Sequence, residues 1–556
     1  MVADDMMPAS FVRWRFNRML AVGTLTMAVN YIVMLSGSVI VGNLVGADGL
    51  AGVNACTPVF GAASFLASLL SVGTALVFSR AMGAFDMRRA EGVFSQSMLA
   101  AIGLGAAIFA AMKLGETAFL DLTGVTGAVR LQAEQYWRWQ SVAMALLPAV
   151  LTLEALVYAD GDGAVALLAG GLHVMGSIGL ATFYTWRDGD AGGVSRGASV
   201  TMMVVLIACS AHFYRKNSHL RFRSRFSLAD MRETLAASLA DSTIYLCWGA
   251  LVFAVNAVVV AVFGQKLLPL VALAASVVEF SIVFDGVGEA LIPVGGMYAG
   301  EGNRPALREL ANWSALVATL EGVVCGVVFF VLAPQIVSWY GFRDESGFHV
   351  QGAVFLLRTL ACAMPFMGLM MMMNTHYLVM RHVLFAVFVT VMKDFICPCA
   401  GVLFLGAVLG EPGLWIGFAA GYAVAACLSF LSVRIQYGRE LFPWLIGRND
   451  GKSVDFTVRL TEDALADAKA RIGEFLNGHD VFETGEALKT IETAGRETLA
   501  ANARPVLCEY FVSVEDEKSV RVVVRDNGKA LPSDGGAYLN TLGCNRTDYR
   551  FVLPGK

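Results

Sequence analysis

Charged residues are scarce in this sequence: Asp, Glu, Lys and Arg make up 15% of its 556 residues, whereas hydrophobic residues make up 56%. A soluble chain of this length carries more charge, because polar groups must cover much of its surface. The shortage excludes an ordinary soluble protein and indicates one that is embedded in a membrane. The formal net charge of −4 is too small to indicate a partner, and we expect no nucleic acid to bind.

Two further absences narrow the class of protein. The sequence lacks the loop Gly-x-x-x-x-Gly-Lys-Ser/Thr that binds phosphates in ATP-driven pumps, which excludes an ABC-type pump. Few Arg or Lys residues lie inside the apolar stretches, which disfavours a flippase of lipid-linked glycans, since such a flippase needs a basic cavity. Most of the ten Cys also lie in apolar stretches, so we expect neither disulfides nor a firm metal site.

Long apolar stretches recur along the first four-fifths of the chain. A helix needs about 20 apolar residues to cross a hydrocarbon layer of ~30 Å. We predict twelve membrane-spanning helices, near residues 19–44, 53–83, 93–113, 132–158, 163–186, 195–216, 234–263, 267–299, 309–334, 350–380, 383–408 and 413–437. The first is interpreted as an uncleaved span, because it is too long for a signal peptide.

The basic residues predict the orientation. Arg clusters at 13–18, 80–89, 215–225, 304–308 and 434–439 fall on alternate loops. Loops rich in Lys and Arg stay on the cytoplasmic side. We therefore expect a multi-pass protein of the bacterial inner membrane with both termini in the cytoplasm.

The membrane part repeats itself. Gly83 follows the second span and Gly300 follows the eighth, an offset of 300 − 83 = 217 residues. Six spans separate them, so both halves have the same topology. We predict an N-terminal six-helix bundle at 1–216, a basic linker at 217–233 and a C-terminal six-helix bundle at 234–437. In secondary transporters with such repeats the substrate path lies between the halves.

Three short motifs resemble the multidrug and toxic compound extrusion (MATE) family. They are VGNLVGADGLAG at 41–52, YADGD at 158–162 and GEGN at 300–303. The resemblance covers about residues 19–437 and implies an antiporter that exports organic, often cationic, drug-like compounds in exchange for H⁺ or Na⁺. Family members often carry an Asp in the first span, where this chain has Gly37. The close packing of helices is an alternative role for the same glycines.

Carboxylates inside apolar spans are the candidates for ion coupling, because an unpaired charge in hydrocarbon is costly and needs a proton, an ion or a partner. Glu279, Asp285 and Glu289 lie in the eighth predicted span, and Asn256 in the seventh could supply a neutral ligand. In a regular helix Asp285 and Glu289 lie about 40° apart. The alternative is a structural ion pair, with Arg358 or Lys393 as partner.

The remaining polar residues of the spans have simpler interpretations. We expect Asp241 and Glu154 to lie at the membrane interface and Lys393 and Asp394 to neutralise each other. Aromatic and thioether side chains suit a cavity for varied organic cations. The candidates for such a cavity are Tyr31, Trp248, Phe253, Phe280 and Met367, and ordinary packing is the alternative for each.

The chain changes character after the last span. A linker at 438–453 precedes a polar segment at 454–556, where period-2 and period-3.6 patterns predict a small α/β domain. GRETLAAN at 495–502 and RDNG at 525–528 resemble the ATPase fold of histidine kinases and anti-sigma-factor kinases. The resemblance implies ATP with Mg²⁺, bound by Glu497, Asn502, Asp526 and Gly528, with Asn502 on the metal.

The sequence of the tail differs from these kinases in two ways. Glu497 stands five residues before Asn502 rather than four, and the segment 531–543 leaves little room for a lid over phosphates. We expect no kinase or ATPase turnover, and a degenerate interaction domain is the alternative.

The sequence as a whole predicts a MATE-like transporter regulated by its tail. The expected partners are small organic molecules, the lipid bilayer and a cytoplasmic regulatory protein. A tail that docks on the basic inner loops would bias the inward-facing state. The alternative is a transport-dead membrane sensor that signals through the tail.

Overall fold

The computed structural model describes residues 10–123, 125–215, 218–263, 267–339, 348–447, 451–479, 484–503, 506–516, 519–529, 536–541 and 544–552. Its first half is helical. The helices are α1 (Phe11–Leu44), α2 (Ala47–Ser68), α3 (Ser71–Gly83), α4 (Met87–Thr123), α5 (Gly127–Ala159), α6 (Gly163–Asp188) and α7 (Gly192–Ser210), with a 3₁₀ turn η1 (Ala211–Tyr214).

The second half repeats this order. It contains α8 (Leu228–Phe263), α9 (Leu268–Phe280), the 3₁₀ turn η3 (Ser281–Phe284), α10 (Asp285–Glu301), α11 (Arg304–Trp339), α12 (Phe348–Val379), α13 (Val383–Val391), the π-helical turn η4 (Met392–Ile396), α14 (Cys397–Leu409), α15 (Glu411–Gln436) and the short α16 (Gly438–Leu441). The start of α4 at Met87 and the start of α11 at Arg304 are 304 − 87 = 217 residues apart, the offset expected from the sequence repeat.

Among the described residues, ten helical segments are long and apolar enough to cross a membrane. Two of the twelve predicted spans are not among the ten. They correspond to α1, and to the segment of α9, η3 and α10 that the 3₁₀ turn interrupts. The count of twelve spans therefore stays a prediction.

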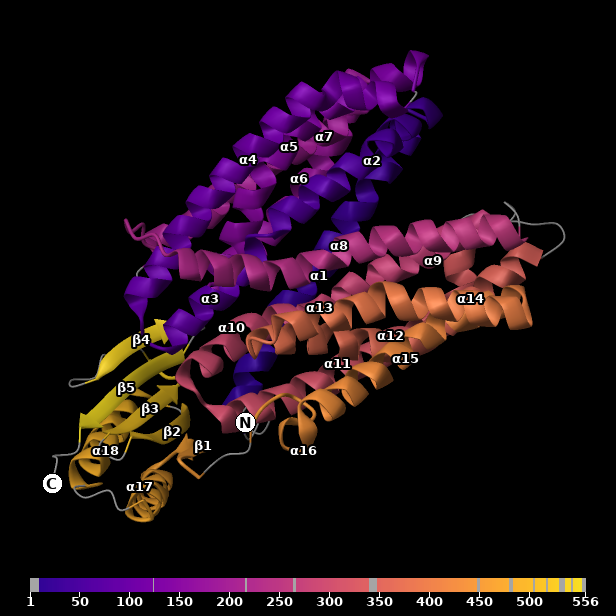
Figure 1. Cartoon of the computed structure of the whole chain (residues 1–556). Coiled ribbons are helices and arrows are strands. Elements are labelled where there is room, and N and C mark those ends of the chain that lie inside the picture. The colour runs from indigo at the N-terminus through magenta and orange to yellow at the C-terminus, as the bar shows by residue number, and fades with distance from the viewer. Residues whose placement is uncertain are drawn as a thin grey trace.

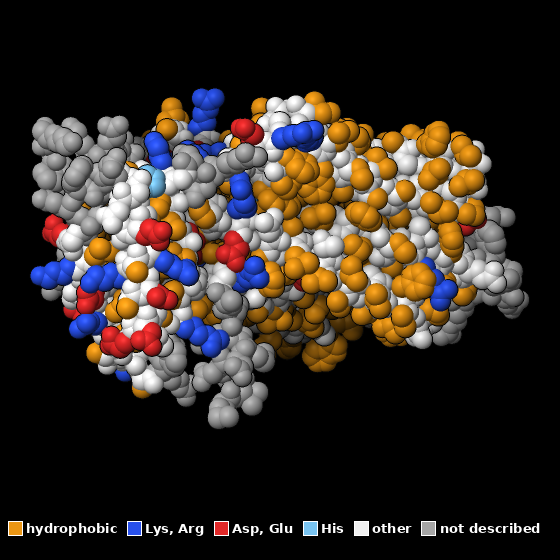
Figure 2. Space-filling view, turned by 90° about the horizontal axis from the view of Figure 1, so that it is seen from below, with side chains coloured by type: hydrophobic (Ala, Val, Ile, Leu, Met, Phe, Trp, Pro, Cys, Tyr) orange, Lys and Arg blue, Asp and Glu red, His pale blue; other side chains and the backbone are white. Residues whose placement is uncertain are grey.

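The helices form two bundles that converge at one end of the molecule and diverge towards the other (Figure 1). One bundle contains α2 and α4 to α7, and the other contains α8 to α15. Helix α1 contacts α6 of the first bundle and α10 of the second. On the face seen in Figure 2, apolar side chains cover the helices, whereas charged side chains gather at the end that carries the tail. This distribution suits a lipid-embedded body with one polar end.

The linker between the halves is shorter than predicted, because α8 begins at Leu228 rather than at 234. Its described part lies along α4. The backbone N–H of Arg223 donates to Ser95 Oγ at 2.7 Å, and that of Ser227 donates to Gln96 Oε1 at 3.0 Å. These bonds satisfy backbone groups that an extended segment would otherwise leave unpaired.

The tail forms the predicted small α/β domain. Its elements are β1 (Ser453–Leu460), α17 (Glu462–Asn477), α18 (Thr484–Ala501), β2 (Val506–Asp516), β3 (Ser519–Asp526), β4 (Ala537–Thr541) and β5 (Cys544–Val552). The strands pair antiparallel in the order β1-β2-β3-β5-β4. The Thr461 side chain caps α17 by accepting from Ala464 N at 3.2 Å.

Alternate side chains of the sheet have different neighbours. Val520, Val522 and Val524 of β3 pack with α17 and α18 in one apolar core. Arg521 and Arg525 of the same strand point the other way, towards the end of α10. The sheet therefore buries one apolar face under its own helices and presents one charged face to the membrane helices, where the bundles converge (Figure 1).

Candidate functional site

A break in one helix brings two of the predicted carboxylates together. The 3₁₀ turn η3 separates Glu279 at the end of α9 from Asp285 at the start of α10. A 3₁₀ turn advances about 120° per residue, against about 100° in an α-helix, so four such residues move Asp285 to about 40° from Glu279. In an uninterrupted helix the two would be about 120° apart. Both carboxylates consequently line one pocket.

This acidic pocket has a volume of about 220 Å³ and lies between α8, α9, α10, α12 and the turn η4. The residues that line it are Asp241, Ile244, Tyr245, Trp248, Val278, Glu279, Ser281, Ile282, Asp285, Met371, Asn374 and Asp394. Four of the twelve are carboxylates and none is basic. The pocket therefore attracts cations, and the low dielectric of the surrounding bundle strengthens the attraction.

The nearest buried cation is already paired. Lys393 Nζ donates to Asp394 Oδ1 at 2.6 Å and to the sulfur of Met371 at 3.2 Å, and the Lys393 side chain is buried. The predicted mutual neutralisation of Lys393 and Asp394 is confirmed. Asp241, Glu279 and Asp285 form no ion pair among the described residues, although Lys393 also interacts electrostatically with Asp241 and Asp285.

Two neutral polar groups of the acidic pocket are unsatisfied. Asn374 Oδ1 and Trp248 Nε1 have no hydrogen-bond partner among the residues that the structure describes. Buried polar groups are normally hydrogen-bonded, so atoms of this kind at a pocket wall suit a ligand. The side chain of Asn374 offers an acceptor and the indole of Trp248 a donor.

Glu289 lies one turn beyond Asp285 and does not line the acidic pocket. It packs against α1, where a Cβ added at Gly23 would lie 3.3 Å from Cβ of Glu289. Its charge still interacts with those of Asp285 and Asp241. Glu289 therefore extends the acidic region from the pocket towards the interface with α1.

Sequence analysis missed three residues of this region and misplaced another. Asp241 was expected at the membrane interface, but it lines the acidic pocket. Asn374 and Tyr245 also line it. Glu321 of α11 is a further carboxylate, beside Thr24 of α1. Glu321 interrupts an apolar run, so the rule that selected Asp285 would have selected it as well.

The predicted cavity residues fall in different places. Trp248 lines the acidic pocket. Tyr31 and Phe280 make an edge-to-face pair at 5.4 Å, and Met367 is buried in the apolar core of the second bundle. Phe253 of α8 is 75% exposed and does not line the acidic pocket. Asn256 belongs to α8, but its side chain lies outside the described residues.

Three of the four predicted nucleotide residues, Asn502, Asp526 and Gly528, lie together and form hydrogen bonds within the tail. Asn502 Oδ1 accepts from Lys529 N at 3.0 Å, and Asp526 Oδ1 accepts from Gly528 N at 2.8 Å and from Asn545 Nδ2 at 2.8 Å. A Cβ added at Gly528 would lie 2.7 Å from Asn502 Nδ2, so Asn502 fills the space beside that glycine. Glu497 is exposed on α18. The polar atoms that would hold a nucleotide are therefore engaged within the tail.

The two halves are joined at the end where they converge. Arg80 of α3 is buried and donates to the carbonyl oxygens of Leu378 and Val379 of α12 at 2.5 and 2.8 Å. It also pairs with Glu233 of α8 at 2.7 Å. These contacts connect the second span of the first half with helices of the second half, and they close this end of the molecule.

The tail adds a second connection at the same end. Glu301, at the end of α10, forms ion pairs with Arg525 of β3 and Arg546 of β5. Arg546 also donates to the carbonyl oxygens of Met82 and Gly83 at the end of α3, where the helix dipole favours a cation. One buried cluster thus ties the sheet to the ends of α3 and α10, one from each half of the sequence.

Glu509 of β2 completes this cluster. It accepts from Arg525 Nη1 at 2.5 Å and from the hydroxyl of Tyr298 at 3.1 Å. Burial lowers the pKa of Arg525 to about 9 and raises the pKa of Glu509 well above its usual range. Both side chains are fully buried, and the ion pair between them offsets part of the cost of removing them from water.

Comparison with known proteins identifies the fold. The MatE family model matches residues 24–180, which lie in the first half. A comparison with curated proteins gave no match. Among solved structures, a MATE protein in complex with MaL6 is 21% identical with a TM-score of 0.72, over 77% of this chain and 97% of that one.

Two further structures are similar to the same extent. An outward-facing conformation of a multidrug resistance MATE family transporter is 21% identical with a TM-score of 0.72, over 77% of this chain and 96% of that one. A transporter of the MOP superfamily from Pyrococcus furiosus, described as having a binding pocket of reversed polarity, is 20% identical with a TM-score of 0.71, over 77% and 96%. The membrane part is therefore a multi-pass helical body with the fold of MATE transporters.

Proposed function

We propose that this protein is a secondary active transporter that exports organic, often cationic, small molecules in exchange for H⁺ or Na⁺. The observation that carries the proposal is the acidic pocket inside a MATE fold, where three carboxylates form no ion pair with any residue that the structure describes. Buried carboxylates that lack a partner bind and release a proton or a metal ion readily. They also attract a cationic substrate.

In the proposed mechanism, the coupling ion and the cationic substrate compete for the same carboxylates of the acidic pocket. Asp241 and Asp285 would hold the coupling ion in one conformer and release it in the other, while Trp248 and Asn374 offer an aromatic face and an acceptor to the substrate. Glu289 and Glu321 lie on the side of α1, so movement of α1 against α10 would change their surroundings. Alternating access then requires only that the two halves rock about the ends where they meet.

The test is uptake of a fluorescent organic cation into proteoliposomes under an imposed proton or sodium gradient. We expect Asp285→Asn to reduce gradient-driven uptake at least tenfold, because the neutral amide cannot take up a coupling proton. Glu289→Gln is expected to have a smaller effect, since Glu289 lies outside the pocket. Asp121→Asn, which changes an exposed carboxylate, is the matched control. Equal uptake by Asp285→Asn and the native chain would refute the proposed site.

We further propose that the docked tail stabilises the conformer that is closed on its own side. Support comes from the cluster around Glu301, which joins the ends of α3 and α10, and from the bundles, which diverge away from the tail (Figure 1). If the tail is cytoplasmic, as the distribution of Arg predicts, this conformer faces outward. The proposal reverses the expectation from sequence that a docked tail would favour the inward-facing state.

Other roles of the tail stay predictions. A cytoplasmic regulatory protein would act by competing for the charged face of the sheet. ATP with Mg²⁺ has weaker support, because the side chains of Asn502 and Asp526 already bond within the tail. A nucleotide would have to displace those bonds before Asn502 could hold the metal.

A further inference from the structure

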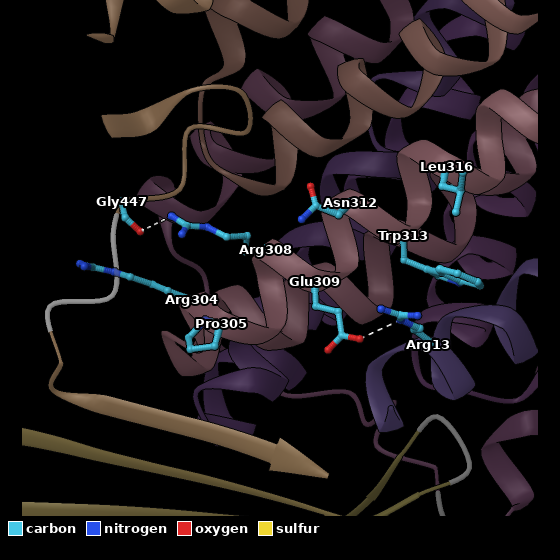
Figure 3. Close-up of a pocket in the computed structure, with 9 residues that line it drawn as sticks. All are labelled: Arg13, Arg304, Pro305, Arg308, Glu309, Asn312, Trp313, Leu316 and Gly447. Atoms are coloured by element: carbon cyan, nitrogen blue, oxygen red, sulfur yellow. Dashed lines mark hydrogen bonds and ion pairs between the residues drawn. The ribbon is translucent and has the colours of Figure 1, made fainter. Parts of the chain in front are cut away.

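A second cavity lies at the polar end of the membrane part, away from the acidic pocket. Its volume is about 560 Å³, and it is formed by the first turns of α11, the start of α1 and the segment that leads to the tail (Figure 3). The residues that line it are Arg13, Arg304, Pro305, Arg308, Glu309, Asn312, Trp313, Leu316 and Gly447. We call this cavity the arginine pocket.

The arginine pocket has an excess of positive charge, since three arginines and one carboxylate line it. Glu309 is paired with Arg13 at 2.8 Å. Arg308 donates to the carbonyl oxygen of Ile446 at 3.0 Å and to that of Gly447 at 3.1 Å, the second of which Figure 3 shows. These bonds fix the position of the guanidinium without neutralising it. A planar guanidinium with remaining donors suits the oxygen atoms of a phosphate.

The other end of the arginine pocket is aromatic and apolar. The guanidinium of Arg13 lies 4.8 Å from the ring centre of Trp313, and the indole N–H of Trp313 donates to Asn17 Oδ1 at 2.8 Å. Trp side chains held in this way are common where a membrane meets water. Trp313 thus places the pocket at the boundary between head groups and hydrocarbon.

An exposed apolar stripe continues from the pocket along α11. Its members, spaced three or four residues apart on one helix face, are Leu316, Leu320, Val324, Val327 and Val331, each between 49% and 62% exposed. The stripe starts at Leu316, which lines the pocket itself. A ligand with a charged head and long apolar chains would match both parts at once.

We propose that the arginine pocket binds the phosphate head group of an anionic phospholipid, whose acyl chains lie along the stripe of α11. Arg308 provides the charge, with Arg304 and the Arg13–Glu309 pair beside it, and the stripe distinguishes a lipid from a free anion. The bound head group would contact Arg308 and therefore the segment that holds Ile446 and Gly447, through which the tail is attached. The inference is independent of the transported substrate.

The experiment uses the full chain, purified in micelles that contain equal amounts of phosphatidylglycerol and phosphatidylcholine, with bound lipid counted by native mass spectrometry. We expect phosphatidylglycerol to be retained in preference. The double variant Arg304→Gln/Arg308→Gln should lower that preference at least about fivefold, since one basic residue at a membrane surface contributes about that factor. Arg88→Gln/Arg221→Gln changes two exposed arginines outside the pocket and is the matched control.

Two further measurements distinguish a bound lipid from a bound soluble anion. Leu316→Ser/Leu320→Ser should weaken retention of phosphatidylglycerol while the arginines stay in place, and millimolar inorganic phosphate should not displace the lipid. Displacement by phosphate would overturn the assignment to a lipid and indicate a site for a soluble anion. Equal retention of the two lipids by the native chain, or an equal loss in the pocket and control variants, would overturn the proposal. Arg304→Lys/Arg308→Lys, which keeps the charge, should retain part of the preference and shows that the chain still folds.

Discussion

At the scale of single residues, Glu301 is the side chain that joins the tail to the end of α10. Its side chain is fully buried between Arg525 and Arg546. We predict that Glu301→Gln weakens docking of the tail by about 3–5 kcal/mol, because it leaves buried Arg546 without its carboxylate partner and Arg525 with Glu509 alone. Hydrogen exchange of the β3 and β5 amides, followed by mass spectrometry, should rise. Glu462→Gln, at an exposed position of α17, should leave exchange unchanged, and the same result for Glu301→Gln would contradict the prediction.

A second prediction for a single residue concerns pH. Burial raises the pKa of Asp455 on β1 to about 7, and the nearby side chain of Asn303 in the membrane part opposes the rise. A carboxyl with a raised pKa binds a proton on docking, so docking is favoured at low pH and this contribution is lost as pH rises through about 7. We expect docking, measured by the same exchange, to be about tenfold weaker at pH 8 than at pH 6. Asp455→Asn should remove most of this difference, and an unchanged pH profile in that variant would assign the effect to another group.

Residues of the acidic pocket were partly predictable, and those of the tail interface were not. Glu279 and Asp285 stand out because one carboxylate in an apolar run is enough to identify a site. Arg525 and Arg546 carry no such signal, since an Arg in a polar α/β domain is ordinary. Their partner Glu301 lies more than 200 residues earlier in the chain, and only the folded structure brings the three together.

At the scale of helices, α3 and α10 cross where glycines allow contact. A Cβ added at Gly83 would collide with the carbonyl oxygen of Met297, and one added at Gly300 with that of Arg80. We predict that Gly83→Ala and Gly300→Ala separate the two helices and raise the population of the conformer that is open on the tail side. Labelling of a single cysteine placed at Ser79 should become several times faster.

The control for this element is Gly103→Ala on α4, where an added Cβ meets no atom within 4 Å. Labelling at Ser79 should not change in this variant. The prediction fails if Gly83→Ala and Gly300→Ala leave the labelling rate as slow as it is in the control.

The breaks within helices explain which parts of the fold the sequence could predict. Apolar length predicted most spans, because crossing a bilayer imposes that length. It did not predict the 3₁₀ turn Ser281–Phe284 or the π-helical turn Met392–Ile396, since neither contains a proline or a glycine. The rotation of about 100° per residue that a regular helix would have therefore does not hold between Glu279 and Asp285, whose side chains share one pocket.

At the scale of the whole molecule, the tail contacts both halves of the membrane part, at the ends of α3 and α10. We predict that deletion of residues 451–556 shifts the chain towards the conformer that is open on the tail side, because the contacts around Arg80 and between α3 and α10 then hold that end closed without the tail. Spin labels at exposed positions near the ends of α3 and α11 should report a longer distance. The full chain with Glu301→Gln should show a smaller shift in the same direction. A deletion that leaves the distance distribution unaltered would show that the tail has no part in closure.

The hydrogen bond from Phe11 N to Thr457 Oγ1, at 3.1 Å, joins the first turn of α1 to strand β1 across 446 residues of sequence. Phe11 also packs with Leu507 and Cys544 of the sheet. During synthesis at about 5–20 residues per second, the start of α1 waits roughly 20–90 s before these partners leave the ribosome. Until then the first turn of α1 lacks its contacts with the sheet. The newly made protein can therefore adopt its closed form only after the tail has been synthesised.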